Sequence, residues 1–126
     1  MTAYPADVQV RAEDPPRPAN LYGATEAWGE ALGAWAAAVS PTSVVCLRIG
    51  FFADQPPAGP AATARNLAAW LRPADCTRLV LAATEAQGVR FAVVNGISAN
   101  RHRHLDLSTT AATIGYVPVD DAWAYD

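Results

Sequence analysis

Two short apolar runs rich in β-branched residues constrain the fold of this chain most. Residues 43–49 form the first run, which Gly50 closes, and residues 89–94 form the second. Apolar runs of this length are typical of strands that are buried on both faces of a parallel sheet. Helical patterns separate the two runs, so the sequence predicts an α/β fold in which helices flank a parallel sheet.

Helical periodicity accounts for much of the remaining chain. Apolar residues recur at helical spacing over residues 21–39, and Asn20 is available as the N-cap. Further helices are predicted over residues 61–71, over residues 73–86, and from a cap at Asp106 or Ser108 to Gly115. The other predicted segments are an extended proline-rich loop over residues 1–20, a Pro/Gly loop over 53–60, a polar loop over 95–103 and a last short turn opened by Asp120.

The composition limits the size of the domain and the partners of the chain. With 126 residues, 52% of them hydrophobic, one small domain is expected. Nine arginines against twelve acidic residues give a net charge of −3, which argues against nucleic acid or an anionic membrane as main partner. Because the N-terminus does not resemble a signal peptide and no long apolar run occurs, we expect a cytoplasmic protein. Cys46 and Cys76 are expected to be buried thiols without a disulfide.

The segment from Pro15 to Glu30 carries the most specific pattern. It reads P-P-R-P-A-N-L-Y-G-A-T-E-A-W-G-E and resembles the P-x-x-P-x-x-x-Y-G-x-[ST]-K-x-x-x-E segment of extended short-chain dehydrogenases, the NAD-dependent epimerase/dehydratase family. The run closed by Gly50 is similar to the family's next strand, which ends in L-R-x-G. Residues 65–76, 94–100 and 114–118 look like elements of the uronate dehydrogenase-like branch.

This resemblance covers the second half of the family's pattern. It implies a partial Rossmann-like (doubly wound) fold, the C-terminal part of the parallel sheet with flanking helices, with the N-terminal dinucleotide-binding half missing. The sequence contains no G-x-x-G-x-x-G turn, and the place of the family's catalytic serine falls at or before Met1. We therefore expect residues 1–126 to form a single truncated domain of this family. The resemblance implies NAD(P) as cofactor, which we do not expect this chain to bind alone, and a sugar acid as substrate.

Tyr22 and Glu26 match the positions of the family's catalytic tyrosine and lysine. The tyrosine exchanges a proton with the substrate oxygen while hydride moves to or from the nicotinamide, and the lysine lies on the same helical face one turn away. A carboxylate at the lysine position disfavours the phenolate by like-charge repulsion. Little or no dehydrogenase activity is therefore expected from the chain alone.

Three further residues match positions near the family's ligands. Arg65 matches the arginine that holds the substrate carboxylate, a task suited to a guanidinium fork, although a solvent-facing helix arginine is an equal alternative. Gly50 and Phe51 follow the first predicted strand, where ligands meet open α/β sheets, and by resemblance their backbone faces the nicotinamide. The alternatives are a glycine that ends a strand and a core phenylalanine.

Two other groups of residues invite a functional interpretation. Residues 101–104, R-H-R-H, lack the ligands for a metal site, so we expect a solvated loop or, less favoured, a substrate contact. Trp28, Trp35 and Trp70 are expected in the core or at helix interfaces.

Two further functions remain open. The chain could be a non-enzymatic interaction module that binds another protein through an open sheet edge and the Tyr22 helix. It could also be half of a split enzyme, completed by a separate nucleotide-binding half. A homo-oligomer is a further possibility, because an exposed strand edge invites pairing.

Overall fold

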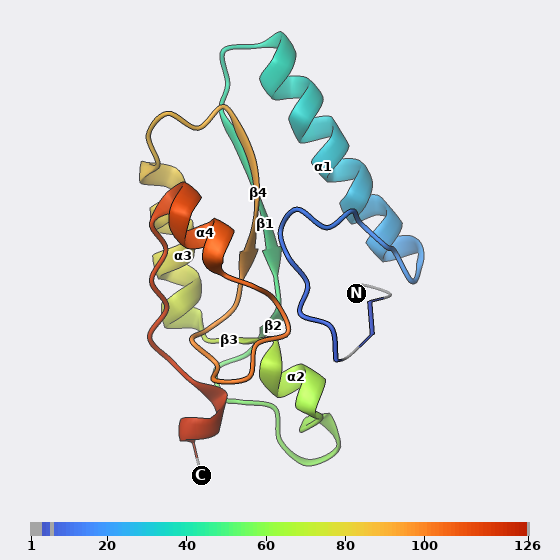
Figure 1. Cartoon of the computed structure of the whole chain (residues 1–126), viewed down its shortest axis with the longest axis vertical. Helices are drawn as coiled ribbons and strands as arrows, with labels where there is room; N and C mark the ends of the chain where they lie inside the picture. The colour runs from blue at the N-terminus through green and yellow to red at the C-terminus, as the bar shows by residue number, and fades with distance from the viewer. Residues whose placement is uncertain (1–3, 6, 126) are drawn as a thin grey trace.

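Two parallel strands form the centre of the computed structural model, which describes residues 4–5 and 7–125 (Figure 1). β1 (Val44–Ile49) pairs in register with β4 (Phe91–Gly96). The predicted parallel pairing is therefore confirmed, with the second strand shifted toward the C-terminus. Gly88 has a left-handed φ of 72°, so residues 88–90 serve the turn before the strand rather than the strand itself.

Helices lie on both sides of this strand pair (Figure 1). On one side is α1 (Leu21–Val39), whose predicted cap is confirmed, because the Asn20 side chain accepts a hydrogen bond from the Gly23 amide at 2.8 Å. On the other side are α3 (Pro73–Glu85) and α4 (Ser108–Ile114). Sequence periodicity thus located three of the four α-helices that the described part of the chain contains.

The helix predicted over residues 61–71 is wrong at both ends. A 3-10 turn, η1 (Gly59–Ala61), precedes the short helix α2 (Ala64–Ala68), and β3 (Trp70–Leu71) follows it. β3 pairs in parallel with β2 (Phe51–Phe52). Tertiary pairing overrides helical propensity at this point.

β3 lies between two other segments of the chain. On one side the Phe51 amide donates to the Ala69 carbonyl at 2.6 Å, and on the other the Ser98 amide donates to the Trp70 carbonyl at 2.9 Å. The segments that follow β1 and β4 therefore diverge, and β3 lies between them and is hydrogen-bonded to both. Trp70 is fully buried there, as predicted.

The last predicted turn begins one residue later than expected. It is a 3-10 turn, η2 (Ala122–Ala124), whose cap is Asp121 and not Asp120. Asp120 is occupied elsewhere, since it accepts a hydrogen bond from the Arg72 guanidinium at 2.6 Å.

The exposed face of α1 is apolar. Trp28 and Trp35 are 67% and 62% exposed, so their predicted place in the core is wrong for the isolated chain. The apolar side chains of this exposed stripe are Leu21, Trp28, Leu32, Trp35 and Val39. The opposite face of α1, which packs on the strands, carries small residues such as Gly33 and Ala37.

A forked ion pair ties α1 to the sheet. Arg48 of β1 donates from Nε and Nη2 to the two carboxylate oxygens of Glu30, at 2.6 and 2.9 Å. Its Nη1 also donates to the Ala12 and Asp14 carbonyls, which fixes the N-terminal segment. The hydrogen bond and charge of Glu30 raise the pKa of Arg48 despite its partial burial. A planar guanidinium suits this task better than an ammonium.

One edge of β1 has no partner strand among the described residues. The Val44 and Gly50 amides donate to the Arg90 and Gly96 carbonyls of the β4 side, at 2.9 and 3.0 Å. Because amides alternate in direction along a parallel strand, those of Val45, Leu47 and Ile49 point to the opposite edge. That edge is a ready template for another strand.

Gly50 is required by close packing. A Cβ built at this position would lie 2.0 Å from the Ala69 carbonyl oxygen and 2.7 Å from Ile97 Cγ2. The first of these neighbours is backbone, so it cannot move aside as a flexible side chain would. This observation favours the structural interpretation of Gly50 as a glycine that lets β1 and β3 approach.

We predict that Gly50→Ala lowers the free energy of unfolding by about 3 kcal/mol, the upper end of the cost of overpacking. Gly29→Ala is the matched control, because a Cβ there meets nothing within 4 Å. In the middle of α1 this control should stabilise the chain by roughly 0.5–1 kcal/mol. Urea unfolding of both variants measures the difference, and equal effects would contradict the packing argument.

Candidate functional site

The sequence-predicted site residues lie toward one end of the molecule. Figure 1 shows that α1 begins at the end where β1 and β4 finish and where α2 lies. Tyr22 is in the first turn of α1, Phe51 follows β1 directly, and Arg65 belongs to α2. Ligands of open α/β sheets bind at the carboxyl ends of the strands, which is this end.

Tyr22 and Glu26 lie on the first two turns of α1 and are both exposed. The Tyr22 ring is open to solvent, with 66% of the residue accessible. No hydrogen bond joins the two side chains in the part of the chain that the structure describes. The four-residue spacing therefore puts them on one helical face without a direct contact.

Phe51 lies at the surface and is 38% exposed, as a residue of β2. The alternative interpretation of Phe51 as a core phenylalanine is therefore wrong. Its neighbour Phe52 is 57% exposed. An apolar surface thus borders the carboxyl end of β1, next to the close approach of Gly50 and Ala69.

Arg65 lines a pocket of about 560 Å³ together with the loop that follows β4. The lining comes from three segments, α2, the loop over residues 102–104, and η2. Its members are Ala64, Arg65, Ala68, His102, Arg103, His104 and Trp123. Of the residues that the structure describes, neither Tyr22 nor Glu26 nor any acidic residue lines this pocket.

His104 is the buried member of this pocket, with an exposed fraction of 6%. Neither Nδ1 nor Nε2 has a hydrogen-bond partner among the described residues. A buried polar group left without a partner costs about 1–3 kcal/mol. Burial, and next the positive charge of Arg65, lower the pKa of His104, so the ring is held neutral.

Backbone and amide hydrogen bonds fix the loop that carries His104. The His104 amide donates to the Ala68 carbonyl at 3.1 Å, which joins the loop to the end of α2. Asn100, fully buried, donates to the Trp70 carbonyl at 2.9 Å and accepts from the Ala122 amide at 3.0 Å. The pocket is therefore built from anchored segments.

The expectation that residues 101–104 form a solvated loop is wrong for His104. Arg101, His102 and Arg103 are exposed, whereas the next side chain turns inward. His102 makes an edge-to-face contact with Trp123, with ring centroids 5.1 Å apart. Alternation along the segment gave no signal for this inward turn, because His102, two residues earlier, is exposed.

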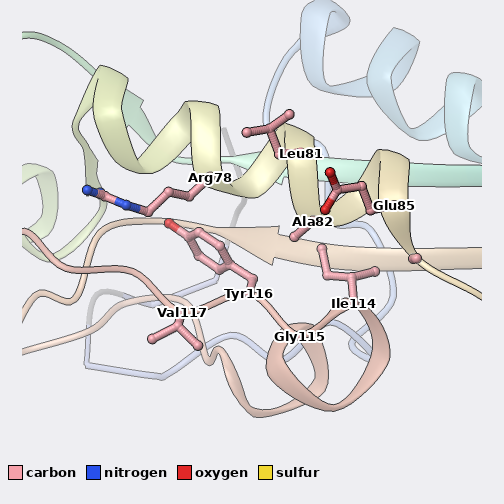
Figure 2. A pocket seen from close by; sticks show the side chains of 9 residues that line it. Arg78, Leu81, Ala82, Glu85, Ile114, Gly115, Tyr116 and Val117 are labelled. Atoms are coloured by element: carbon pink, nitrogen blue, oxygen red, sulfur yellow. The ribbon is translucent and has the colours of Figure 1, made fainter.

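A second hollow of about 410 Å³ lies between α3 and the segment that follows α4 (Figure 2). Leu81, Ile114 and Val117 make much of its lining apolar. The Tyr116 hydroxyl donates to the Ile97 carbonyl at 2.9 Å, and burial raises the pKa of this phenol. Arg78 Nη1 forms an ion pair with the buried carboxylate of Asp75, at 2.7 Å from Oδ1. Tyr116 and Arg78 are therefore engaged within the fold, and Glu85 supplies the one carboxylate among the described residues of this lining.

Within residues 4–5 and 7–125, no group of three His, Cys, Asp or Glu side chains is arranged to hold a metal ion. Cys46 and Cys76 are free thiols, and both are half-buried rather than fully buried as predicted. None of the described helices combines the length and hydropathy needed to span a bilayer.

Two curated proteins of Haloferax volcanii match the sequence over most of its length. A NAD-dependent glucose-6-phosphate dehydrogenase is 36% identical over 85% of this chain and 40% of its own length. An L-arabinose 1-dehydrogenase (NAD(P)+) is 39% identical over 90% of this chain and 47% of its own length. The chain thus spans about half the length of the relatives it matches. No protein-family model matches the sequence.

The fold matches that of a uronate dehydrogenase. The crystal structure of uronate dehydrogenase from Agrobacterium tumefaciens superposes with a TM-score of 0.87 at 28% identity. The match covers 99% of this chain and 45% of that protein. Nearly the whole of this chain is therefore similar to less than half of such an enzyme. The predicted partial Rossmann-like fold and the uronate dehydrogenase-like resemblance are thereby confirmed.

We predict that His104 makes the stability of the chain depend on pH. The folded state holds the ring neutral, whereas the unfolded chain takes up a proton below about pH 6.5. Stability should therefore fall as the pH falls through that value toward the lowered pKa of the folded state. Relative to His104→Gln, the wild-type free energy of unfolding should drop by up to about 1.4 kcal/mol per pH unit. Urea unfolding at a series of pH values measures this, and parallel profiles would contradict it.

Proposed function

We propose that this chain is the C-terminal, substrate-side half of an NAD(P)-dependent sugar dehydrogenase. One observation carries the proposal: nearly the whole chain superposes on about 45% of a uronate dehydrogenase, without the rest of that enzyme. The nucleotide-binding half would then be supplied by another segment, on the same polypeptide or on a separate one.

The residues at the strand ends support a division of tasks between the two halves. Gly50 and Phe51 lie where an open α/β sheet meets its ligand, so they fit the edge of a nicotinamide site. The sequence has no Gly-rich turn for a pyrophosphate, so its residues do not fit the remainder of a dinucleotide. When bound, NAD(P) supplies the hydride acceptor. This chain would supply the surface against which the substrate is held.

Tyr22 would take the proton from the substrate hydroxyl. Its exposure on the first turn of α1 leaves the phenol accessible to a substrate at this end of the molecule. Glu26 cannot donate the positive charge that stabilises a phenolate, and its negative charge opposes one. The negative charge of Glu26 would therefore slow the turnover of the complete enzyme.

The unpaired edge of β1 is where the missing half would join. The amides of Val45, Leu47 and Ile49 point outward there, ready for a parallel strand. The exposed stripe of α1 supports a second contact, with another copy of the assembled protein. Its two tryptophans are more than 60% exposed in the isolated chain.

The test is a chimera in which this chain replaces the matching part of the H. volcanii L-arabinose 1-dehydrogenase. We predict slow NAD reduction with a sugar or sugar-acid substrate, and a rate about 10²-fold higher after Glu26→Lys, the lower end of acid–base contributions. The gain should extend to lower pH, because the cation favours the phenolate. Initial rates of NADH formation measure both effects.

Two variants of the chimera separate charge from geometry. Glu26→Gln removes the repulsion without adding a cation and should give an intermediate rate. Tyr22→Phe should abolish the gain from lysine. A wild-type chimera as fast as the lysine variant would overturn the role assigned to position 26, and a chimera that folds and binds NAD without any turnover would overturn the proposed function.

A further inference from the structure

The hollow between α3 and the segment that follows α4 forms an open groove, which we call the α3 groove (Figure 2). One wall is the stripe of α3 that carries Arg78, Leu81 and Glu85, and the other wall is formed by residues 114–117. Leu81 is 52% exposed and Val117 is 72% exposed. Exposed apolar side chains that gather in one place, with polar residues at the rim, are typical of a protein–protein contact.

Arg78 and Glu85 give this stripe of α3 a charge of opposite sign at each end. They are seven residues apart, so they lie on the same side of the helix and about 10 Å apart along its axis. Figure 2 shows the two side chains at opposite ends of this wall, with Leu81 between them. The midpoint of the charge pattern therefore falls at Leu81 and Ala82.

We propose that the α3 groove binds the α3 groove of a second copy of this chain, with the two α3 helices antiparallel about a twofold axis near Leu81. In a twofold contact, the same surface patch of each copy meets its counterpart. Arg78 of each copy then faces Glu85 of the other copy, so the ion pair forms twice. Leu81 of each copy enters the groove of the other copy, beside Val117.

Charge complementarity selects this arrangement. In a parallel pair of α3 helices, Arg78 would face Arg78 and Glu85 would face Glu85, and both contacts are repulsive. Glu85 is exposed, and its carboxylate takes part in no ion pair within the described residues. In the same part of the chain, Arg78 forms its ion pairs with Asp75 and Asp120 through Nη1. Its Nε and Nη2 are therefore available to a carboxylate of the second copy.

Apolar contact would supply the affinity of the dimer, and the charges would set its register. Ion pairs at the rim of an interface contribute little free energy, whereas burial of apolar side chains is favourable. Ala82 and Ala86 are the small side chains of the α3 wall, so the incoming Leu81 finds space beside them. Because one helix stripe and one short loop from each copy make a small interface, we expect a weak dimer, with a dissociation constant of about 100 µM.

The α3 groove is separate from the surfaces at which the other half of the enzyme is proposed to join. Among the described residues, its lining comes from α3, the end of α4 and the segment after α4, and β1 contributes none of it. The exposed stripe of α1 lies on the other side of the strand pair (Figure 1). The dimer would therefore form in the isolated chain, and it does not rest on the proposed function.

Sedimentation equilibrium of the isolated chain, over about 10 µM to 1 mM, tests the proposal. The wild type should dimerise, Leu81→Gln should weaken the dimer at least about tenfold, and Val80→Gln should leave it unchanged. Val80 is the matched control, because it is 46% exposed and points about 100° away from Leu81 around the same helix. A wild type that stays monomeric throughout, or equal effects of the two variants, would overturn the proposal.

Salt tests the antiparallel register. Raising the NaCl concentration from about 50 mM to about 500 mM should weaken the wild-type dimer roughly threefold, because it screens the two ion pairs. Glu85→Gln should remove most of this dependence. Asp54→Asn makes the same change of charge at an exposed residue outside the groove and should retain it. Equal salt dependence of the two variants would contradict the register.

Trp28→Gln distinguishes the α3 groove from the stripe of α1. Trp28 is 67% exposed, so this stripe is the competing surface for self-association. The dimer should survive Trp28→Gln and be weakened by Leu81→Gln. A dimer that is lost in Trp28→Gln and retained in Leu81→Gln would overturn the proposal. These measurements need neither NAD nor turnover, so their outcome is independent of the chimera.

Discussion

The parallel pairing of β1 with β4 is the interaction on which the rest of this structure depends. It sets the carboxyl end at which α2, β2 and β3 gather, and it leaves β1 with an unpaired second edge among the described residues. Arg48 extends from β1 to hold α1 and the N-terminal segment. The inner strands of a parallel sheet are paired along both edges. The unpaired edge of β1 is therefore a structural reason to expect a second half.

Two separate groups of candidate functional residues lie toward one end of this sheet. Tyr22 and Glu26 are proposed to occupy a proton-transfer position, in which the charge at residue 26 is opposite to that of the family's lysine. Arg65 and the His102–His104 loop line a pocket of about 560 Å³.

Sequence reasoning recovered the elements that local pattern determines. Asn20 begins α1 as predicted, and the apolar run before Gly50 is a parallel strand. The sequence-based prediction failed where contacts with distant segments determine the secondary structure. Trp70, for example, pairs with β2 although the neighbouring sequence favours a helix. The inward turn of His104 was missed for the same reason, because the Ala68 carbonyl that anchors its backbone lies far away in sequence. The exposed tryptophans of α1 were misplaced because sequence periodicity marks an apolar face but not what covers it.

Hydrogen exchange along β1 tests most directly the claim that this chain is one half of a larger sheet. In the isolated chain, the amides of Cys46 and Arg48 should be protected by β4, and those of Val45, Leu47 and Ile49 should exchange rapidly. In the chimera with the nucleotide-binding half, all five should be protected. Protection of Val45, Leu47 and Ile49 in the monomeric isolated chain, or their rapid exchange in the chimera, would contradict the account.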